Sequence, residues 1–349
     1  MFPISNHITY YRMKRQNLLC LSFFISLVLV SCGGKTGKDN QNGSGEKEET
    51  EHPQFVDSTA FNQKITQLAN GDTTGLWPVK NQPLPLYGAL LPEHRIVAFY
   101  GNLYSKKMGA LGEYPPKEMW AKLKAEVKAW EAADPTTPVI PALHYIAVVA
   151  QGDAGKDGKY RFRMPEKQID SVFTISRMHP GTLVFLDIQV ALSKIQDELP
   201  LLEKYLRLPN VHLGIDPEFS MKDGSKPGKR IGTYDAKDIN YCSEYLAKLV
   251  KEHNLPPKVF VIHRFTQGMI TNYKNIKLHP EVQIVIDMDG WGEPELKKGT
   301  HRNYIHKEPI QFTGFKLFYK NDLKKSPNRL MTPQELLKLR PQPSYIQYQ

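Results

Sequence analysis

The sequence contains little cysteine, with three residues among 349, at positions 20, 32 and 242. So few thiols predict no disulfide framework. Several catalytic motifs are also missing, among them the Gly-x-Ser-x-Gly nucleophile elbow, the Gly-x-Gly-x-x-Gly dinucleotide fingerprint and the His-Glu-x-x-His zinc helix. Their absence argues against serine hydrolases and against nicotinamide or flavin enzymes. We predict no cofactor and no metal.

Positive charge is in excess but is not clustered. The net charge of +10 is spread along the chain, and no zinc-finger spacing, helix-turn-helix or RNA-binding signature accompanies it. Nucleic acid is therefore not predicted as a partner. A mildly basic surface suits a membrane-facing protein and an acidic polymer equally well.

The N-terminal segment has the features of a secretory signal peptide. Arg12, Lys14 and Arg15 precede the apolar run Leu18–Val30. That run of about a dozen residues is shorter than the roughly 20 that a membrane-spanning helix needs. The translated chain is expected to start at either Met1 or Met13.

The four residues Leu29-Val30-Ser31-Cys32 at the end of this run resemble the lipobox of bacterial lipoproteins. In that family the cysteine thiol receives a diacylglyceryl group and becomes the new N-terminus. The resemblance implies a signal peptide over 1–31 and a membrane partner held through lipid on Cys32. Gly33, where an inner-membrane lipoprotein has Asp, implies the outer membrane of the cell envelope.

Composition divides the rest of the chain into three parts. Residues 32–52 are polar and Gly-rich, which predicts a flexible tether after the lipidated cysteine. Residues 53–94 are expected to form an N-terminal cap with one helix near 59–68. Residues 95–349 form the main domain, where short apolar runs alternate with helical periodicity.

The main domain is predicted to be a parallel α/β structure. Seven apolar runs are typical of strands that are buried on both faces: 95–101, 139–149, 182–190, 211–219, 259–265, 282–289 and 312–319. Helical spacing lies between them: 119–130, 195–206 and 239–250, the last after an N-cap at Asp235. This alternation favours a (β/α)8 TIM-like barrel. The eighth strand would come from 84–91 or from part of 139–149; a seven-stranded barrel and an open doubly wound sheet are the alternatives.

Polar side chains gather where the predicted strands end. In parallel barrels the carboxyl ends of the strands form the active site, so these residues are expected to meet at one rim. The candidates for substrate binding are Tyr100, Asn102, His144, Gln189, His263, Arg264, Asp287, Trp291 and Lys316. The candidates for catalysis are Glu218, Asp216, Asp187 and Asp289.

The sharpest local motif is Asp216-Pro217-Glu218. Residues i and i+2 of a strand face the same side, so both carboxyls are expected to face the pocket, where each shifts the titration of the other. A carboxyl kept protonated in this way can act as a general acid on a glycosidic oxygen. The alternative interpretation is that Asp216 caps the next loop and Glu218 pairs with Lys222 or Arg230.

An Asp-x-Glu pair that ends the fourth strand of a barrel resembles the chitinase-type glycoside hydrolases. The resemblance implies that Glu218 is the acid and that Asp216 orients it. The longer acidic repeat of that family is missing, because Leu213 and Gly214 precede the pair. The segments VAFYGN, LVFLDIQ, LGIDPEF, KVFVIHRF and IDMDG also resemble a family of secreted bacterial barrel proteins with no assigned activity.

The sequence therefore predicts a lipid-anchored glycoside hydrolase-like protein that acts on an extracytoplasmic carbohydrate or glycoconjugate. Asp187 and Asp289 are the candidates for the base or nucleophile that acts with Glu218. A metal-dependent hydrolase is one alternative, since the histidines and carboxylates of the rim are plausible ligands. A lipoprotein that binds a glycan or a cell-wall fragment without catalysis is the other.

Overall fold

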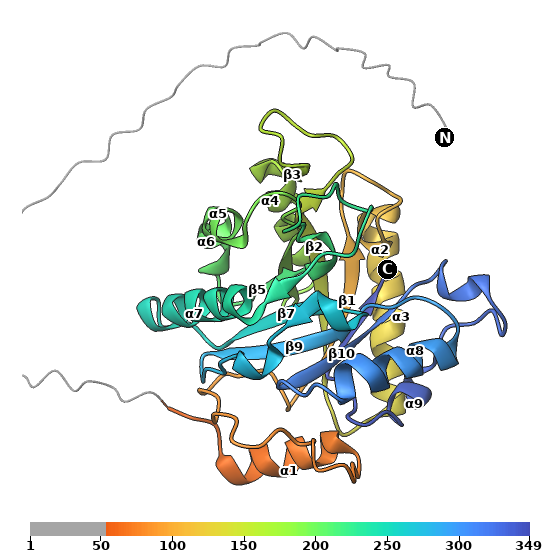
Figure 1. Cartoon of the computed structure of the whole chain (residues 1–349). Helices are drawn as coiled ribbons and strands as arrows, with labels where there is room; N and C mark the ends of the chain where they lie inside the picture. The colour runs from red at the N-terminus through yellow and green to blue at the C-terminus, as the bar shows by residue number, and fades with distance from the viewer. Residues whose placement is uncertain (1–53) are drawn as a thin grey trace, which may run out of the picture. The chain divides into compact units, whose positions relative to one another are not determined.

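The computed structural model describes residues 54–349 (Figure 1). The predicted signal peptide, Cys32 and the tether lie outside the described residues and stay predictions. Within 54–349, none of the helices is long and apolar enough to cross a membrane.

A closed parallel barrel forms the centre of the described part. The main sheet has nine strands, of which β3 (Arg161–Arg163) only extends the end of β2 in an antiparallel hairpin. The other eight pair side by side in parallel, and β1 pairs with both β2 and β11, which closes the ring. The barrel strands are β1 (Arg95–Gly101), β2 (Val139–Ala150), β4 (Leu183–Ile188), β5 (Val211–Ile215), β7 (Lys258–Arg264), β9 (Val282–Met288), β10 (Phe312–Leu317) and β11 (Tyr345–Tyr348). A separate two-stranded pairing joins β6 (Tyr234–Asp235) to β8 (Ile270–Thr271).

Helices surround the strands (Figure 1). The two longest helices, α3 and α7, begin at residues that favour a helix start. Helix α3 has Pro116 at its first position, and α7 has a capping box between Asp235 and Asp238. The N-cap predicted at Asp235 is thereby confirmed. The helices are α1 (Ser58–Ala69), α2 (Ala110–Glu113), α3 (Pro116–Ala133), α4 (Glu166–Ser176), α5 (Ile195–Glu198), α6 (Glu203–Leu206), α7 (Ala236–Glu252), α8 (Pro294–Thr300) and α9 (Pro333–Leu336).

The predicted (β/α)8 barrel is confirmed, but the eighth strand was placed wrongly. It is β11, near the C-terminal end, and it lies between β10 and β1. Residues 84–91 form no barrel strand, and 139–150 is one continuous strand. Because β11 has only four residues, Tyr-Ile-Gln-Tyr, and one of them is a glutamine, it lacks the continuous apolar run that marked the other strands.

The barrel interior changes character along its axis. Alternate residues of a strand face inward, and in β1 these are Ile96, Ala98 and Tyr100. The inward residues at the amino ends of the strands form an apolar cluster, for example Ile96, Val259 and Val285. Further along the same strands, His263 follows Val259 and Val261 on the same face. Polar residues at several strand ends, His263 among them, therefore project into one interior, as the sequence predicted.

The segment 54–94 covers the apolar end of this interior. Phe61 and Ile65 of α1, together with Leu91, belong to the same buried cluster as the inward strand residues. In Figure 1 α1 is the orange helix at the lower edge of the view. Both hydrophobic clusters of the described part consist of residues between Val56 and Tyr348. Since all barrel strands also lie in this range, residues 54–349 contain what a single domain needs to fold.

Ile346 tests the closing strand. Its side chain is fully buried on the outer face of β11, and we expect Ile346→Ala to lower the free energy of unfolding by about 2–5 kcal/mol through loss of packing. Ile231, which is 48% exposed, provides the matched control, and Ile231→Ala should change stability little. Urea unfolding of residues 54–349 measures both. Equal loss in the two variants would contradict the placement of β11 in the core.

Candidate active site

A cavity of about 510 Å³ opens at the carboxyl ends of the barrel strands. This is the size range of small-molecule sites. Its wall combines carboxyl, amine and amide groups with aromatic and apolar side chains. The lining residues are Tyr100, Lys107, Met108, Ile146, Ala150, Gln189, Asp216, Glu218, Phe219, Phe265, Asp289, Gly290, Trp291, Leu296, Thr300, Lys316, Phe318 and Gln349.

The Asp216–Glu218 motif is held by a turn and not by a strand. Strand β5 ends at Ile215, and Pro217–Phe219 form a short 3₁₀ helix. The Asp216 carboxylate caps it by accepting a 3.1 Å hydrogen bond from the Glu218 backbone N–H. The expectation that the two carboxyls share a strand face was therefore wrong, because the chain turns at Pro217. Both residues nevertheless line the cavity.

A close approach of Gly232 fixes this turn from outside. Its N–H donates to the Glu218 carbonyl at 2.6 Å, and a Cβ at this position would lie 2.6–2.7 Å from the carbonyl oxygens of Pro217 and Glu218. Glu218 forms no ion pair in the described residues, while Lys222 pairs with Asp238. The carboxyl of Glu218 is thus placed by its backbone and remains free to act in the cavity.

Asp289 faces the same cavity but has a different electrostatic environment. The Lys316 ammonium lies 3.0 Å from its Oδ1, and the His263 Nδ1 lies 3.2 Å from its Oδ2. Lys316 also sits 3.9 Å from the centroid of the Tyr100 ring. Burial raises the pKa of Asp289, but the charges of Lys316 and His263 outweigh burial and hold that pKa below its usual value. Asp289 is therefore ionised at neutral pH.

The pKa of the Glu218 carboxyl is shifted in the opposite direction, upward. Burial, followed by repulsion from Asp289, raises the pKa of Glu218 to about 7. Burial also raises the pKa of Asp216 well above its usual value, and the Glu218 charge adds to this. Because the two carboxyls interact, they titrate as a pair, and we expect them to hold at least one proton near neutral pH.

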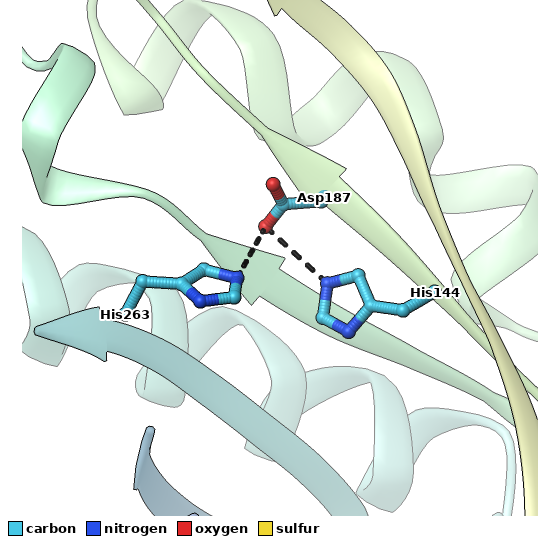
Figure 2. A group of neighbouring side chains, drawn as sticks. All are labelled: His144, Asp187 and His263. Atoms are coloured by element: carbon cyan, nitrogen blue, oxygen red, sulfur yellow. Dashed lines mark ion pairs between the residues drawn. The ribbon is translucent and has the colours of Figure 1, made fainter. Parts of the chain in front are cut away.

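Beneath the cavity floor lies a group of buried ionisable side chains, shown in Figure 2. Asp187 stands between His144 and His263, with its Oδ1 3.4 Å from the His144 Nε2 and 3.6 Å from the His263 Nε2. All three side chains are fully buried. Tyr100, which lines the cavity, donates its hydroxyl hydrogen to the other Asp187 oxygen at 3.1 Å and links the group to the floor.

Further groups orient the two imidazoles. The His144 Nδ1 forms a 2.6 Å hydrogen bond with the Tyr345 hydroxyl, and the Gln347 amide lies 3.1 Å from the same atom. The His263 Nδ1 lies 3.3 Å from the Asp287 carboxylate as well as near Asp289. Burial lowers the pKa of His144 to about 4, whereas the surrounding carboxylates overcome burial and raise the pKa of His263 well above its usual value.

Asp187 does not line the cavity, which argues against the prediction that it acts as a base or nucleophile. Its pKa is lowered because its contacts with His144 and His263 outweigh the effect of burial, and its oxygens face these rings and Tyr100. Asp287 lies behind His263 in the same buried layer. His144, His263 and Asp287 are therefore brought together as predicted, but below the floor and not on the substrate surface.

Two predicted binding residues point elsewhere. Asn102 donates to the Ile146 carbonyl and accepts from the Tyr104 N–H, so it shapes the loop after β1. The Arg264 guanidinium is fully buried and binds three carbonyls and the Glu308 carboxylate, which anchors the π-helical segment His301–His306. Gln189, Lys316 and the half-exposed Trp291 do line the cavity.

Sequence reasoning missed the residues that support the site from β11 and β5. Tyr345 and Gln347 orient His144, and their i, i+2 spacing would have indicated them once the last strand was recognised. Gly214 was noted only as a departure from the chitinase motif. In the structure it pairs in register with Asp187, and a Cβ there would lie 2.3 Å from the His144 Nε2 and 2.5 Å from the Asp187 Oδ1.

Comparison with known proteins leaves the family open. No protein-family model and no curated protein matches this chain. A solved structure that matches is a mannanase, BCman, from Bacillus subtilis, at 10% sequence identity and a TM-score of 0.34, with 83% of this chain and 84% of that chain covered. A likeness of this size has no bearing on reaction or substrate.

The fold and the cavity by themselves define a structural class for this protein. The chain is an eight-stranded (β/α) barrel whose carboxyl-end cavity holds a protonatable carboxyl, Glu218, and an ionised one, Asp289.

Gly214 tests the packing of the buried layer. We expect Gly214→Ala to lower the free energy of unfolding by about 1–3 kcal/mol, because the added methyl group meets two side chains that are fully buried. Gly268→Ala is the control, since no atom lies within 4 Å of a Cβ at that position. Chemical unfolding midpoints compare the two. If Gly214→Ala is as stable as Gly268→Ala, the buried layer is less tightly packed than described.

Proposed function

We propose that this protein is a hydrolase of glycosidic bonds, with Glu218 as general acid and Asp289 as the opposing carboxylate. The observation that carries the proposal is the pair itself. One cavity holds a half-buried carboxyl with no ion-pair partner in the described residues, Glu218, and a carboxylate fixed by a 3.0 Å ion pair with Lys316, Asp289. Two carboxyl groups kept in opposite protonation states are what glycoside hydrolysis requires.

In the reaction, Glu218 donates its proton to the glycosidic oxygen as the bond from that oxygen to the anomeric carbon breaks. Asp289 acts at the anomeric carbon in one of two ways. It attacks directly, and water activated by deprotonated Glu218 then cleaves the glycosyl–Asp289 bond, or it takes a proton from a water that attacks the carbon itself. These two modes give retention and inversion of configuration. Asp216 serves as the positioning residue, because its carboxylate accepts from the Glu218 N–H and from the Gln189 amide.

The cavity wall supports a carbohydrate as the substrate class. Trp291 is 49% exposed beside the cavity, and an exposed aromatic ring offers an apolar face to a sugar ring. Lys107, Gln189 and Gln349 add amine and amide groups that can bond to hydroxyls. Lys316 forms an ion pair with Asp289. Its ammonium group therefore stabilises that carboxylate and is not a free cation for the substrate.

The pH dependence of the reaction follows from Glu218. Its pKa of about 7 means that the acid is protonated below that pH and loses its proton above it. We therefore expect kcat/KM to fall about tenfold per pH unit above roughly pH 7. Residues 54–349 would be incubated with a panel of bacterial and plant polysaccharides, with release of reducing ends as the readout.

Glu218→Gln provides the decisive variant. It keeps the shape of the side chain but cannot donate a proton, so we expect kcat to fall by about 10²–10⁴-fold and the alkaline limb to disappear. Glu244→Gln, on the surface of α7, should leave activity unchanged. A different result would contradict hydrolysis: the wild type and Glu218→Gln bind a polysaccharide with equal affinity, and neither releases reducing ends. The protein would then be one that captures a glycan without cleaving it.

We also propose that the chain is a lipoprotein of the outer membrane, anchored through Cys32. The support is the lipobox Leu29–Cys32 and the following Gly33. Expression of the full chain in a bacterium with an alkyne analogue of palmitate should label the wild type and Cys20→Ser but not Cys32→Ser. Label retained in Cys32→Ser would rule out this attachment.

A further inference from the structure

We infer that His144, Asp187 and His263 bind a divalent transition-metal ion beneath the cavity floor, with Zn²⁺ as the representative ion. The inference goes beyond the proposed hydrolysis, which assigns no role to a metal. Each residue contributes one potential ligand atom, and these atoms all lie within 4.8 Å of one another (Figure 2).

The two separations from the Asp187 oxygen match those between ligands of one ion, and the two imidazole nitrogens lie within 4.8 Å of each other. Zinc binds imidazole nitrogen and carboxylate oxygen at about 2.0–2.2 Å, so two tetrahedral ligands of one ion lie roughly 3.3–3.6 Å apart. The Asp187 Oδ1 lies 3.4 Å from the His144 Nε2 and 3.6 Å from the His263 Nε2. Both separations are longer than the usual 2.7–3.2 Å of a direct N–H···O hydrogen bond.

The same three atoms have no other partner in the described residues. The Nε2 atoms of both histidines and the Asp187 Oδ1 are buried without a hydrogen bond. Buried polar groups are normally satisfied, and three that point at one another without satisfying one another are unusual. A cation coordinated by all three would satisfy them together.

The surroundings orient these atoms as a metal site requires. Metal-binding histidines usually contact a carboxylate, hydroxyl or carbonyl through the ring nitrogen that is not a ligand. Here the His144 Nδ1 bonds to the Tyr345 hydroxyl at 2.6 Å, and the His263 Nδ1 lies 3.2 Å from the Asp289 carboxylate. A hydrogen bond thus orients the His144 ring, a charge contact lies behind the His263 ring, and both rings present their Nε2 to the Asp187 oxygen.

Gly214 adds an independent indication. A side chain at this position of β5 would place its Cβ 2.3 Å from the His144 Nε2 and 2.5 Å from the Asp187 Oδ1. The missing side chain thus lets two of the three potential ligand atoms approach the backbone of β5, in a strand where a β-branched residue would otherwise be favoured.

The donor set selects the class of ion. Two imidazoles and one carboxylate suit Zn²⁺, Fe²⁺ and related transition metals, whereas Ca²⁺ and Mg²⁺ prefer oxygen ligands throughout. The metal would not face the cavity directly. It would act through Tyr100, which bonds to Asp187, and through Asp289, which contacts His263; both line the cavity. Its role is to fix the floor on which the substrate rests.

The test measures binding and not activity. Residues 54–349, with any affinity tag removed, are freed of metal with a chelator, loaded with Zn²⁺, separated from unbound ion, and analysed for zinc per chain. We expect one zinc per folded wild-type chain. We also expect the melting temperature to rise by roughly 5 °C when free Zn²⁺ is a hundredfold above its Kd.

Asp187→Asn, His144→Gln and His263→Gln should lose the bound zinc and the rise in melting temperature. His212→Gln is the matched control, because His212 is an equally buried residue on the inner face of β5, outside the three-residue group, and should retain both. For wild-type protein loaded with Co²⁺, d–d absorption bands of a nitrogen–oxygen site provide a readout that depends on no variant.

Folded wild-type protein that binds no zinc, or binds as much as Asp187→Asn does, would overturn the inference. The group would then remain the proton-sharing cluster of the metal-free protein, in which Asp187 neutralises protonated His263 and no ion displaces the proton. Neither result decides the proposed hydrolysis, because the reducing-end assay is done separately on chelated and on metal-loaded enzyme.

Discussion

The pairing of β11 with both β10 and β1 is the constraint on which the rest of the structure depends. It turns an open sheet, whose inner face would meet water, into a closed interior. Only inside that closed space are carboxylates and imidazoles desolvated enough for their pKa values to move far apart. The same strand supplies Tyr345 and Gln347, which hold His144 in place. The strand that closes the barrel therefore also orients one member of the buried group beneath the cavity.

Charge in this interior is arranged in two layers. In the lower layer, the negative charge of Asp187 is opposed by His263, which also contacts Asp287, and none of these groups reaches solvent. In the upper layer Asp289 is matched by Lys316, and Glu218 is not matched. Since a buried charge is costly without a partner, the proton is kept by Glu218 and its neighbour Asp216, which form no ion pair in the described residues and titrate together. The lower layer therefore sets the electrostatic background against which Glu218 titrates.

The barrel could be predicted from the sequence because seven strands are continuous apolar runs that end in polar residues. The positions at strand ends also predicted that five residues would meet at one cavity: Tyr100, Gln189, Glu218, Asp289 and Lys316. The sequence did not predict how deep in the barrel interior each carboxylate lies. Asp187 and Asp289 look alike in sequence, but one lies below the floor and the other on it. Arg264 follows His263 directly, and the strand alternation sends its side chain to the opposite face, where it binds Glu308. Short β11 carried no apolar run to find.

The closing contact also has a consequence for how the chain reaches its native state. Ile96 pairs with Tyr345, so the last ladder joins the first barrel strand in the sequence to the last one. Any intermediate that lacks this ladder has two unpaired sheet edges, β1 and β10, and such edges can add strands from other molecules. Joining so distant segments is slow because of the entropy of closing a long loop. The barrel is therefore most vulnerable to aggregation in the interval before β11 docks, whatever the stability of the finished fold.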